Sequence, residues 1–236
     1  MRQQFLLDRP GRAVYLAFAL VAGCRSLPGP LVPIDAAPVS ADQVGAWVAV
    51  TAPSSHSVHQ FKWLFRNDRS SAGGVGRARI APPDSLRFDA RGPLGSGRMA
   101  AVIIGDRALW AEPEDQVRQI VPDFTLLWAI FGVARLPAPG STLRGIDDGR
   151  GMAWEYAAGR DTIVYARSKG LPGQLRVEVR SGGKVFGRVE TKLSASGQPV
   201  SARLTVPEVP AQLDITFVST TLESPFPPET WLPPEP

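Results

Sequence analysis

The chain has 236 residues, a formal net charge of +4 and 44% hydrophobic residues. Ample apolar content at low net charge excludes a disordered protein, and a single cysteine excludes a scaffold held by internal disulfides. The 23 glycines and 23 prolines favour short strands joined by many turns over a helical bundle. The length suits one all-β domain, and the modest basic excess does not indicate a nucleic-acid partner.

The first 23 residues have the pattern of an export signal. Met1–Arg12 is basic, and Ala13–Gly23 follows without a charge. A stretch of that length spans only ~16 Å as a helix, so it predicts a signal peptide and not a membrane span. Leu20–Cys24 resembles the bacterial lipobox, which implies cleavage before Cys24 and acylation of its thiol. The alternative is a cysteine buried in an uncleaved segment.

The residue after the cysteine bears on the destination of the protein. In proteobacterial lipoproteins an Asp at that position favours retention in the inner membrane, and this chain has Arg25 there. The resemblance therefore implies an anchor in the outer membrane, with the protein facing the periplasm.

The mature chain is predicted to consist of a tether, one domain and a tail. Residues 24–40 are rich in proline and are expected to form an extended tether between the lipid and the domain. Residues 41–223 are expected to form the folded domain. Residues 224–236 are again rich in proline and are expected to form an extended C-terminal tail.

The domain is predicted to begin with a short helix at 41–50. Ser40 and Gln43 have the spacing of a capping box, and Pro53 follows the helix. The apolar positions share one face, which should be buried; they are Val44, Trp47 and Val48.

Period-two alternation dominates from Gln60 to Thr220. Ser85–Arg91 alternates apolar and charged residues, as expected for an antiparallel strand with one wet face, whereas Met99–Ile104 is apolar throughout and should be covered on both faces. We expect a mainly β fold, a single curved, half-open antiparallel sheet (a half-barrel) of about eleven strands. These are Phe61–Arg66, Gly76–Ala81, Ser85–Arg91, Arg98–Gly105, Arg107–Ala111, Met152–Tyr156, Asp161–Ala166, Gln174–Arg180, Val185–Leu193, Ser201–Val206 and Gln212–Thr220.

Two short helices are predicted in the middle of the chain, and they should cover the concave face of the sheet. Glu112–Val117 has acidic residues in its first turn, where they complement the helix dipole. Phe124–Gly132 is apolar nearly all round, so either both of its faces are buried or one face is kept for an apolar ligand. Gly132 is a suitable C-terminal stop.

The sequence contains no recognisable catalytic motif. There is no nucleophile elbow, phosphate-binding loop, dinucleotide fingerprint or paired Cys-x-x-Cys, so no enzyme activity, catalytic residue or cofactor is predicted. His56 and His59 could share a metal only as part of a larger set, and no third ligand is near in sequence. A solvated pair in a loop is the expected arrangement, with no metal site.

Three stretches of the sequence resemble the LolA/LolB-like lipoprotein carriers, and within them the outer-membrane lipoprotein acceptors, LolB. They are the lipobox at Cys24, the turn Arg91–Ser96 with its Pro-Leu-Gly-Ser sequence, and Leu127–Pro137, which resembles the pattern Trp-x-x-Gly-x-Pro with an insertion before the proline. The helix at 41–50 and the proline-rich tail depart from that family, which leaves room for a sister family with another cargo.

The resemblance implies an apolar trough for acyl chains on the concave face. An acyl chain needs only apolar area, which gains ~25 cal/mol per Å² removed from water. The alternative is that the same side chains form an ordinary packed core. The candidate trough residues are Phe88, Met99, Ile103, Trp110, Trp128, Phe131 and Trp154.

The resemblance also implies that the turn at Pro93, Leu94 and Gly95 dips into the membrane. A leucine between glycines and a proline is not expected to reach the core, although single exposed leucines are common and need no explanation.

Together these features predict a monomeric, lipid-anchored protein that accepts or carries acylated lipoproteins and helps to insert them into the membrane. The expected partners are acylated lipoproteins or lipid, the membrane itself and a periplasmic carrier protein. Two alternatives stay open: a binding module for another lipid or glycolipid, and a structural envelope lipoprotein that carries nothing.

Overall fold

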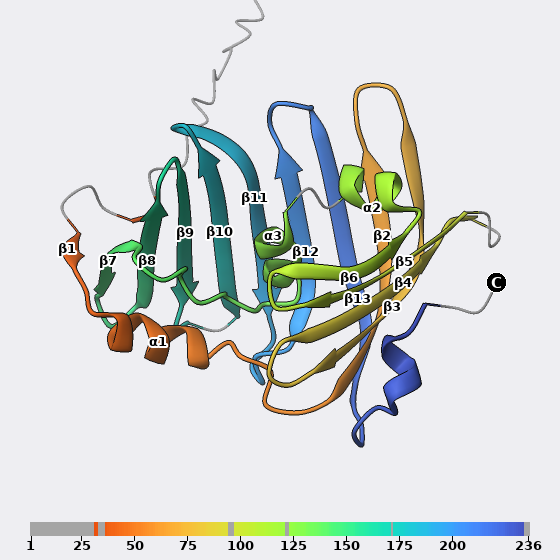
Figure 1. Ribbon diagram of the computed structural model, residues 1–236, viewed down its shortest axis with the longest axis horizontal. Helices are drawn as coiled ribbons and strands as arrows, with labels where there is room; N and C mark the ends of the chain where they lie inside the picture. The colour runs from red at the N-terminus through yellow and green to blue at the C-terminus, as the bar shows by residue number, and fades with distance from the viewer. Residues whose placement is uncertain (1–30, 33–35, 94–96, 121–122, 171, 234–236) are drawn as a thin grey trace, which may run out of the picture.

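The protein folds into a single open antiparallel sheet of thirteen strands with a few short helices (Figure 1). The structure, a computed structural model, describes residues 31–32, 36–93, 97–120, 123–170 and 172–233. The strands lie in the order β1-β7-β8-β9-β10-β11-β12-β13-β2-β3-β4-β5-β6. Because β1 and β6 end the order without pairing to each other, the sheet is not a closed barrel, as the sequence predicts.

The described part of the chain contains two strands more than the sequence predicts. These are the two-residue β1 and its partner β7, so that the end of the expected tether pairs with the sheet. The strands are β1 (Ala37–Pro38), β2 (Ser57–Arg66), β3 (Ser71–Ala81), β4 (Ser85–Arg91), β5 (Arg98–Ile104), β6 (Arg107–Glu112), β7 (Thr142–Asp147), β8 (Gly151–Ala158), β9 (Asp161–Ser168), β10 (Gly173–Ser181), β11 (Lys184–Leu193), β12 (Pro199–Val206) and β13 (Ala211–Leu222).

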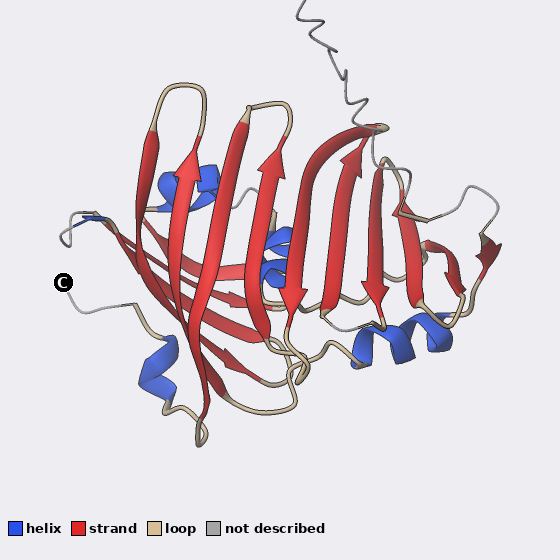
Figure 2. Ribbon diagram, turned by 180° about the vertical axis from the view of Figure 1, so that it is seen from behind, coloured by secondary structure: helices blue, strands red, loops and turns tan. Residues whose placement is uncertain are grey.

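Strand periodicity decides which residues enter the core. In β4, Leu86, Phe88 and Ala90 are buried while the charged residues between them face outward, as predicted. We call the face that carries α3 (Phe124–Ile130) the concave face and the opposite one the convex face (Figures 1 and 2). The large hydrophobic core lies between α1, α3 and the concave face.

The first helix, α1 (Ala41–Ala49), forms as predicted. The Ser40 hydroxyl accepts a hydrogen bond from the Gln43 N–H at 3.1 Å, and the stripe Val44, Trp47 and Val48 is buried. The Trp47 ring sits over β7, where a Cβ on Gly145 would come within 2.6 Å of it. Glycine at that position therefore allows the helix to pack closely on the sheet.

The helix α3 is buried on every side. The Asp123 side chain accepts the Leu126 N–H at its N-terminus, and Gly132 ends it with a φ of +80°. Two hydrogen bonds fix its position, from the Thr191 hydroxyl to the Ala129 carbonyl and from the Trp128 indole to the Gly105 carbonyl. The shorter helix α2 (Glu114–Ile120) packs near β5 and β6.

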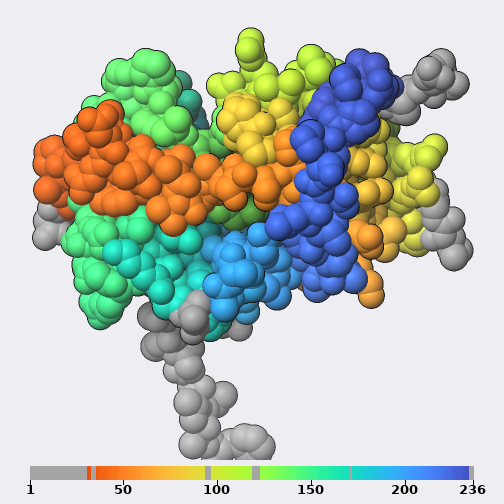
Figure 3. Space-filling model, turned by 90° about the horizontal axis from the view of Figure 1, so that it is seen from below, coloured from red at the N-terminus to blue at the C-terminus, as the bar shows by residue number. Residues whose placement is uncertain are grey.

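The C-terminal segment folds back onto the convex face. Pro228–Trp231 forms one turn of 3-10 helix, and the Arg87 guanidinium donates to the Thr230 and Leu232 carbonyls at 2.7 and 3.1 Å. The C-terminal segment was expected to be an extended tail. Its described part instead packs on the convex face, and we call it the C-terminal cover. Figure 3 shows it (blue) beside the residues that follow α1 (orange).

Candidate functional site

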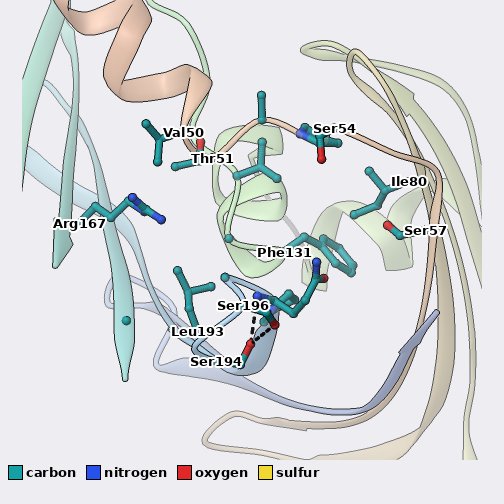
Figure 4. Close-up of a pocket in the computed structure, with 18 of the residues that line it drawn as sticks. Val50, Thr51, Ser54, Ser57, Ile80, Phe131, Arg167, Leu193, Ser194 and Ser196 are labelled. Atoms are coloured by element: carbon teal, nitrogen blue, oxygen red, sulfur yellow. Dashed lines mark hydrogen bonds between the residues drawn. The ribbon is translucent and has the colours of Figure 1, made fainter. Parts of the chain in front are cut away.

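A pocket of about 500 Å³ opens at the end of the sheet near the C-terminus of α1 (Figure 4). Its walls include the loop after α1, the end of β9 with the start of the β9–β10 connection, the β11–β12 turn and the residues at the end of α3, together with residues of β2, β3 and β13. The Thr51 hydroxyl joins two of them, since it donates to the Val48 carbonyl and accepts the Ala134 N–H, both at 2.8 Å. The pocket is therefore built where distant segments are tied together.

The charged side chains that line the pocket are both basic. They are Arg167 and Lys169, and no carboxylate side chain belongs to the described lining. Lys169 is already paired, because its ammonium lies 2.8 Å from the Asp147 carboxylate; the hydrogen bond from Lys169 lowers the pKa of Asp147. Arg167 is different, because its Nε is buried without a hydrogen-bond acceptor among the described residues. The pocket thus offers one unpaired positive charge.

One wall of the pocket holds a buried histidine. The two nitrogens of His59 lie 3.0 Å from the Ser57 and Thr220 hydroxyl oxygens, and its ring contacts those of Phe131 and Phe217. Burial lowers the pKa of His59 to about 4, so the ring is neutral at pH 7. The prediction of a solvated His56 and His59 pair in a loop is wrong for His59, which belongs to β2, while His56 packs against Phe226.

The alternation of β2 begins earlier than the sequence analysis places it. Ser57, His59, Phe61, Trp63 and Phe65 occupy every second position and are all buried. Extending the period-two pattern toward the N-terminus would have found His59 on the buried face. No sequence pattern predicts a role for Arg167, because its distinguishing feature, a buried Nε without a hydrogen-bond acceptor among the described residues, is visible only in the folded structure.

Phe131 separates the pocket from a small apolar cavity deeper in the concave face. The cavity measures about 40 Å³, and its lining exposes no polar surface. Phe131 lines both spaces and touches the rings of Phe61 and Phe217 at centroid distances of 6.4 and 5.7 Å. The cavity lining is Phe61, Trp63, Phe88, Ala90, Met99, Leu127, Ile130, Phe131, Leu213 and Ile215.

The seven candidate trough residues do not all lie together. Phe88, Met99 and Phe131 line the apolar cavity. Ile103, Trp128 and Trp154 are fully buried in the core that contains it, and Trp154 stacks on Tyr165 with ring centroids 5.1 Å apart.

Trp110 is the exception, and its assignment to the trough is corrected. It pairs with Val102, which shares the convex face with Arg87. The Arg87 guanidinium lies over its ring, and its indole donates to the Trp231 carbonyl at 2.9 Å. The sequence prediction failed because a register shift in the β5–β6 pairing follows Val102, and because the C-terminal cover was not expected.

Two other predicted sites lie outside the described residues in whole or in part. Cys24 is outside them, as are Leu94 and Gly95 of the turn after β4. Pro93, which precedes them, is exposed.

A second hollow, of about 950 Å³, lies at β2 to β6; most of its charged side chains are basic, and Phe61, Ala90 and Met99 line both it and the apolar cavity. Asp89 accepts hydrogen bonds from Arg79 and Arg87 there. The charged residues of the hollow are Lys62, Arg77, Arg79, Arg87, Asp89, Arg91, Arg98 and Glu112.

Two further searches cover only the described part of the chain. No three His, Cys, Asp or Glu side chains gather there as a metal site would require. Of the helices in that part, none combines the length and apolar content needed to cross a bilayer.

Comparison with known sequences gives no relative. A scan against protein-family models finds no match, and a search of curated proteins finds no similar sequence.

Solved structures give distant likenesses of fold. An outer-membrane lipoprotein-sorting protein domain from Vibrio parahaemolyticus is 9% identical, with 81% of this chain and 97% of that chain covered and a TM-score of 0.49. A LolA superfamily protein from Nitrosomonas europaea is 9% identical, with 83% of this chain and 98% of that chain covered and a TM-score of 0.39. MucB is 15% identical, with 84% of this chain and 65% of that chain covered and a TM-score of 0.39. Likenesses this distant concern the arrangement of elements alone, and none singles out the LolB acceptors.

Proposed function

We propose that this is a lipid-anchored protein of the bacterial cell envelope that binds the acyl chains of a lipoprotein cargo at the concave face. The observation that carries the proposal is the position of Phe131 between two spaces. On one side is the pocket of about 500 Å³ that opens at the end of the sheet, and on the other is the apolar cavity. An acyl chain entering the pocket would gain by covering the apolar side chains of Leu193 and Phe131, and Phe131 also lines the cavity beyond.

The proposal requires side chains to move. The apolar cavity holds about 40 Å³, well below the roughly 150 Å³ cavity that accommodates a benzene molecule. A long chain must therefore displace Phe131. The ring is held by edge contacts to the rings of Phe61 and Phe217, and the next residue is Gly132, whose positive φ is a conformation that glycine adopts without strain.

The membrane side of the proposal rests on the sequence. Acylation at Cys24 would anchor the chain, because several acyl chains at ~0.8 kcal/mol per buried methylene hold a protein stably on a bilayer. The turn at Pro93, Leu94 and Gly95 would touch the membrane during transfer, and a periplasmic carrier would deliver the cargo to this outer-membrane protein.

A second candidate function has its own supporting observation. Five consecutive residues of α3, Leu126–Ile130, are buried, and hydrogen bonds fix the helix on both sides. A helix held this firmly suits a structural envelope lipoprotein with a filled core. A trough for another lipid or glycolipid would use the same pocket as the first proposal.

Two matched variants test the choice between a ligand site and a filled core. Phe131→Ser changes the wall of the pocket, whereas Trp154→Ser changes the packed cluster under α1. Truncating a large aromatic residue in a packed core costs about 3–5 kcal/mol, so Trp154→Ser should melt far below the wild type.

For each variant, binding of a fluorescent fatty acid is measured beside the melting temperature. The proposal expects Phe131→Ser to lose binding with a clearly smaller loss of melting temperature than Trp154→Ser. Equal melting losses, together with a wild-type protein that binds no fatty acid, would favour the structural role.

A further inference from the structure

Arg167 presents a positive charge to the pocket without a partner. It lies near the end of β9 on the concave face, opposite Leu175 of β10, which in turn faces Thr191 of β11. Figure 4 shows its side chain reaching into the pocket. The residue is half-buried, its Nε is fully buried, and no described residue accepts a hydrogen bond from it.

The buried Nε of Arg167 is costly to leave without a partner. A donor removed from water without an acceptor loses its hydration and gains no hydrogen bond in return. Two other polar side chains of the lining already have partners, because Lys169 pairs with Asp147 and the Ser194 hydroxyl is 2.9 Å from that of Ser196. A built site with one free cation and no carboxylate in its described lining fits an anion.

The apolar part of the pocket lies close enough to serve the same ligand. Strands are about 4.8 Å apart, so Arg167 is about 10 Å across the sheet from β11, which ends at Leu193. Leu193 lies beside Gly132, with its Cδ2 2.9 Å from where a Cβ on that glycine would be. A ligand with a negative head at Arg167 would therefore extend a tail toward Leu193 and Phe131.

We propose that Arg167 binds the carboxylate or phosphate headgroup of an amphiphile whose acyl chain runs past Leu193 to Phe131. The fork of N–H donors on arginine matches the oxygens of either group, and a charge-assisted hydrogen bond is stronger than a neutral one. This inference rests on the proposed acyl-binding function and adds to it the class of ligand. The neutral His59, which also lines the pocket, adds no second charge to it.

Three probes with one fluorescent chain test the proposal on the full-length protein: pyrenedodecanoic acid, pyrenedodecyl phosphate and pyrenedodecanoic acid methyl ester. The wild type should bind at least one of the two anionic probes about tenfold more tightly than the ester, which corresponds to about 1.4 kcal/mol. Preference for the carboxylate indicates a free fatty acid, and preference for the phosphate indicates a phospholipid headgroup.

Variants then assign the preference to Arg167. Arg167→Gln should lower the affinity for the preferred anion to that of the ester and leave ester binding unchanged. Arg167→Lys keeps the charge without the fork and should give an intermediate affinity. Arg77→Gln is the control, because it removes an exposed arginine that lines the second hollow and not the pocket, and it should leave all three affinities unchanged.

Two results would overturn the inference while leaving the acyl site intact: equal binding of ester and anions by the wild type, or an anion preference that persists in Arg167→Gln. The first needs no variant, so it holds even if Arg167→Gln does not fold. Failure of every probe to bind would overturn both the inference and the proposed function.

Discussion

At the scale of single residues, burial determines the charge of His59. The folded protein keeps this ring neutral because its pKa falls from 6.5 to about 4. Its partners are hydroxyl groups and phenyl rings, and no charged side chain is in contact with it through a described interaction. An unfolded chain at pH 5 therefore binds a proton that the folded chain does not.

The sign of the resulting pH dependence follows directly. Between the folded and unfolded pKa values the unfolded state holds more protons, so the free energy of unfolding decreases as the pH falls. From pH 7 to pH 5 the contribution of His59 should fall by about 2 kcal/mol. Urea unfolding at both pH values measures it in the wild type and in His59→Gln, which should lack this share of the decrease. An identical decrease in the two proteins would contradict the assignment.

Glu178 gives a pH dependence of the same sign through a different cause. Burial alone would raise the pKa of its carboxyl group, but hydrogen bonds from Arg188 and Arg180 outweigh burial and lower the pKa. The stability that this ion pair contributes is present at neutral pH and is lost as the pH falls through the lowered pKa. Acid therefore weakens the protein through both residues.

At the scale of elements, the seat of α3 depends on a glycine of the strand beneath it. A Cβ on Gly187 of β11 would lie 2.4 Å from Leu126 Cδ1, too close unless the buried Leu126 side chain or the helix moves. We expect Gly187→Ala to lower the free energy of unfolding by about 1–3 kcal/mol, as overpacking of a core does. Urea unfolding measures the change.

A second glycine supplies the control. Gly45 lies within α1, and a Cβ there would meet nothing within 4 Å. Gly45→Ala should therefore stabilise the protein by roughly 0.5–1 kcal/mol, because alanine is the better helix former. Destabilisation by both substitutions to a similar extent would show that the close packing of α3 on Gly187 is not the cause.

The elements also show where sequence reasoning succeeds. Strong alternation, as in β4, and a capped amphipathic helix, as in α1, are local signals, and both were predicted within a residue of their observed bounds. Two strands were missed for local reasons: β1 has only two residues and ends in Pro38, and β7 has Gly145 in its middle. Neither presents a run of alternating apolar residues.

At the scale of the whole molecule, the open sheet was predictable and the site was not. The count and spacing of alternating segments indicate one large antiparallel sheet. The face of the sheet on which Trp110 lies depends on a register shift and on the docked C-terminal segment. Arg167 stands out only because no described residue accepts a hydrogen bond from its buried Nε. Such features arise from distant parts of the chain meeting, which no local pattern records.

The membrane anchor gives a prediction for the intact protein. Cys24→Ala should leave an uncleaved precursor that incorporates no labelled palmitate in cells, since the thiol is the proposed site of acylation. Ser26→Ala, two residues away, should be processed and labelled like the wild type. Normal processing and labelling of Cys24→Ala would contradict the proposed anchor.

The central claim is that acyl chains of a cargo occupy the pocket beside Phe131, and photocrosslinking in the native membrane tests it most directly. Val50 lines the pocket and is exposed, so it can be replaced by benzoylphenylalanine with little disturbance; the exposed Leu109 of β6, which does not line it, is the control position. After irradiation, mass spectrometry identifies the crosslinked species. The account predicts acylated protein or its acyl chain joined at position 50 and not at position 109. No crosslink at position 50, or the same products at both positions, would contradict it.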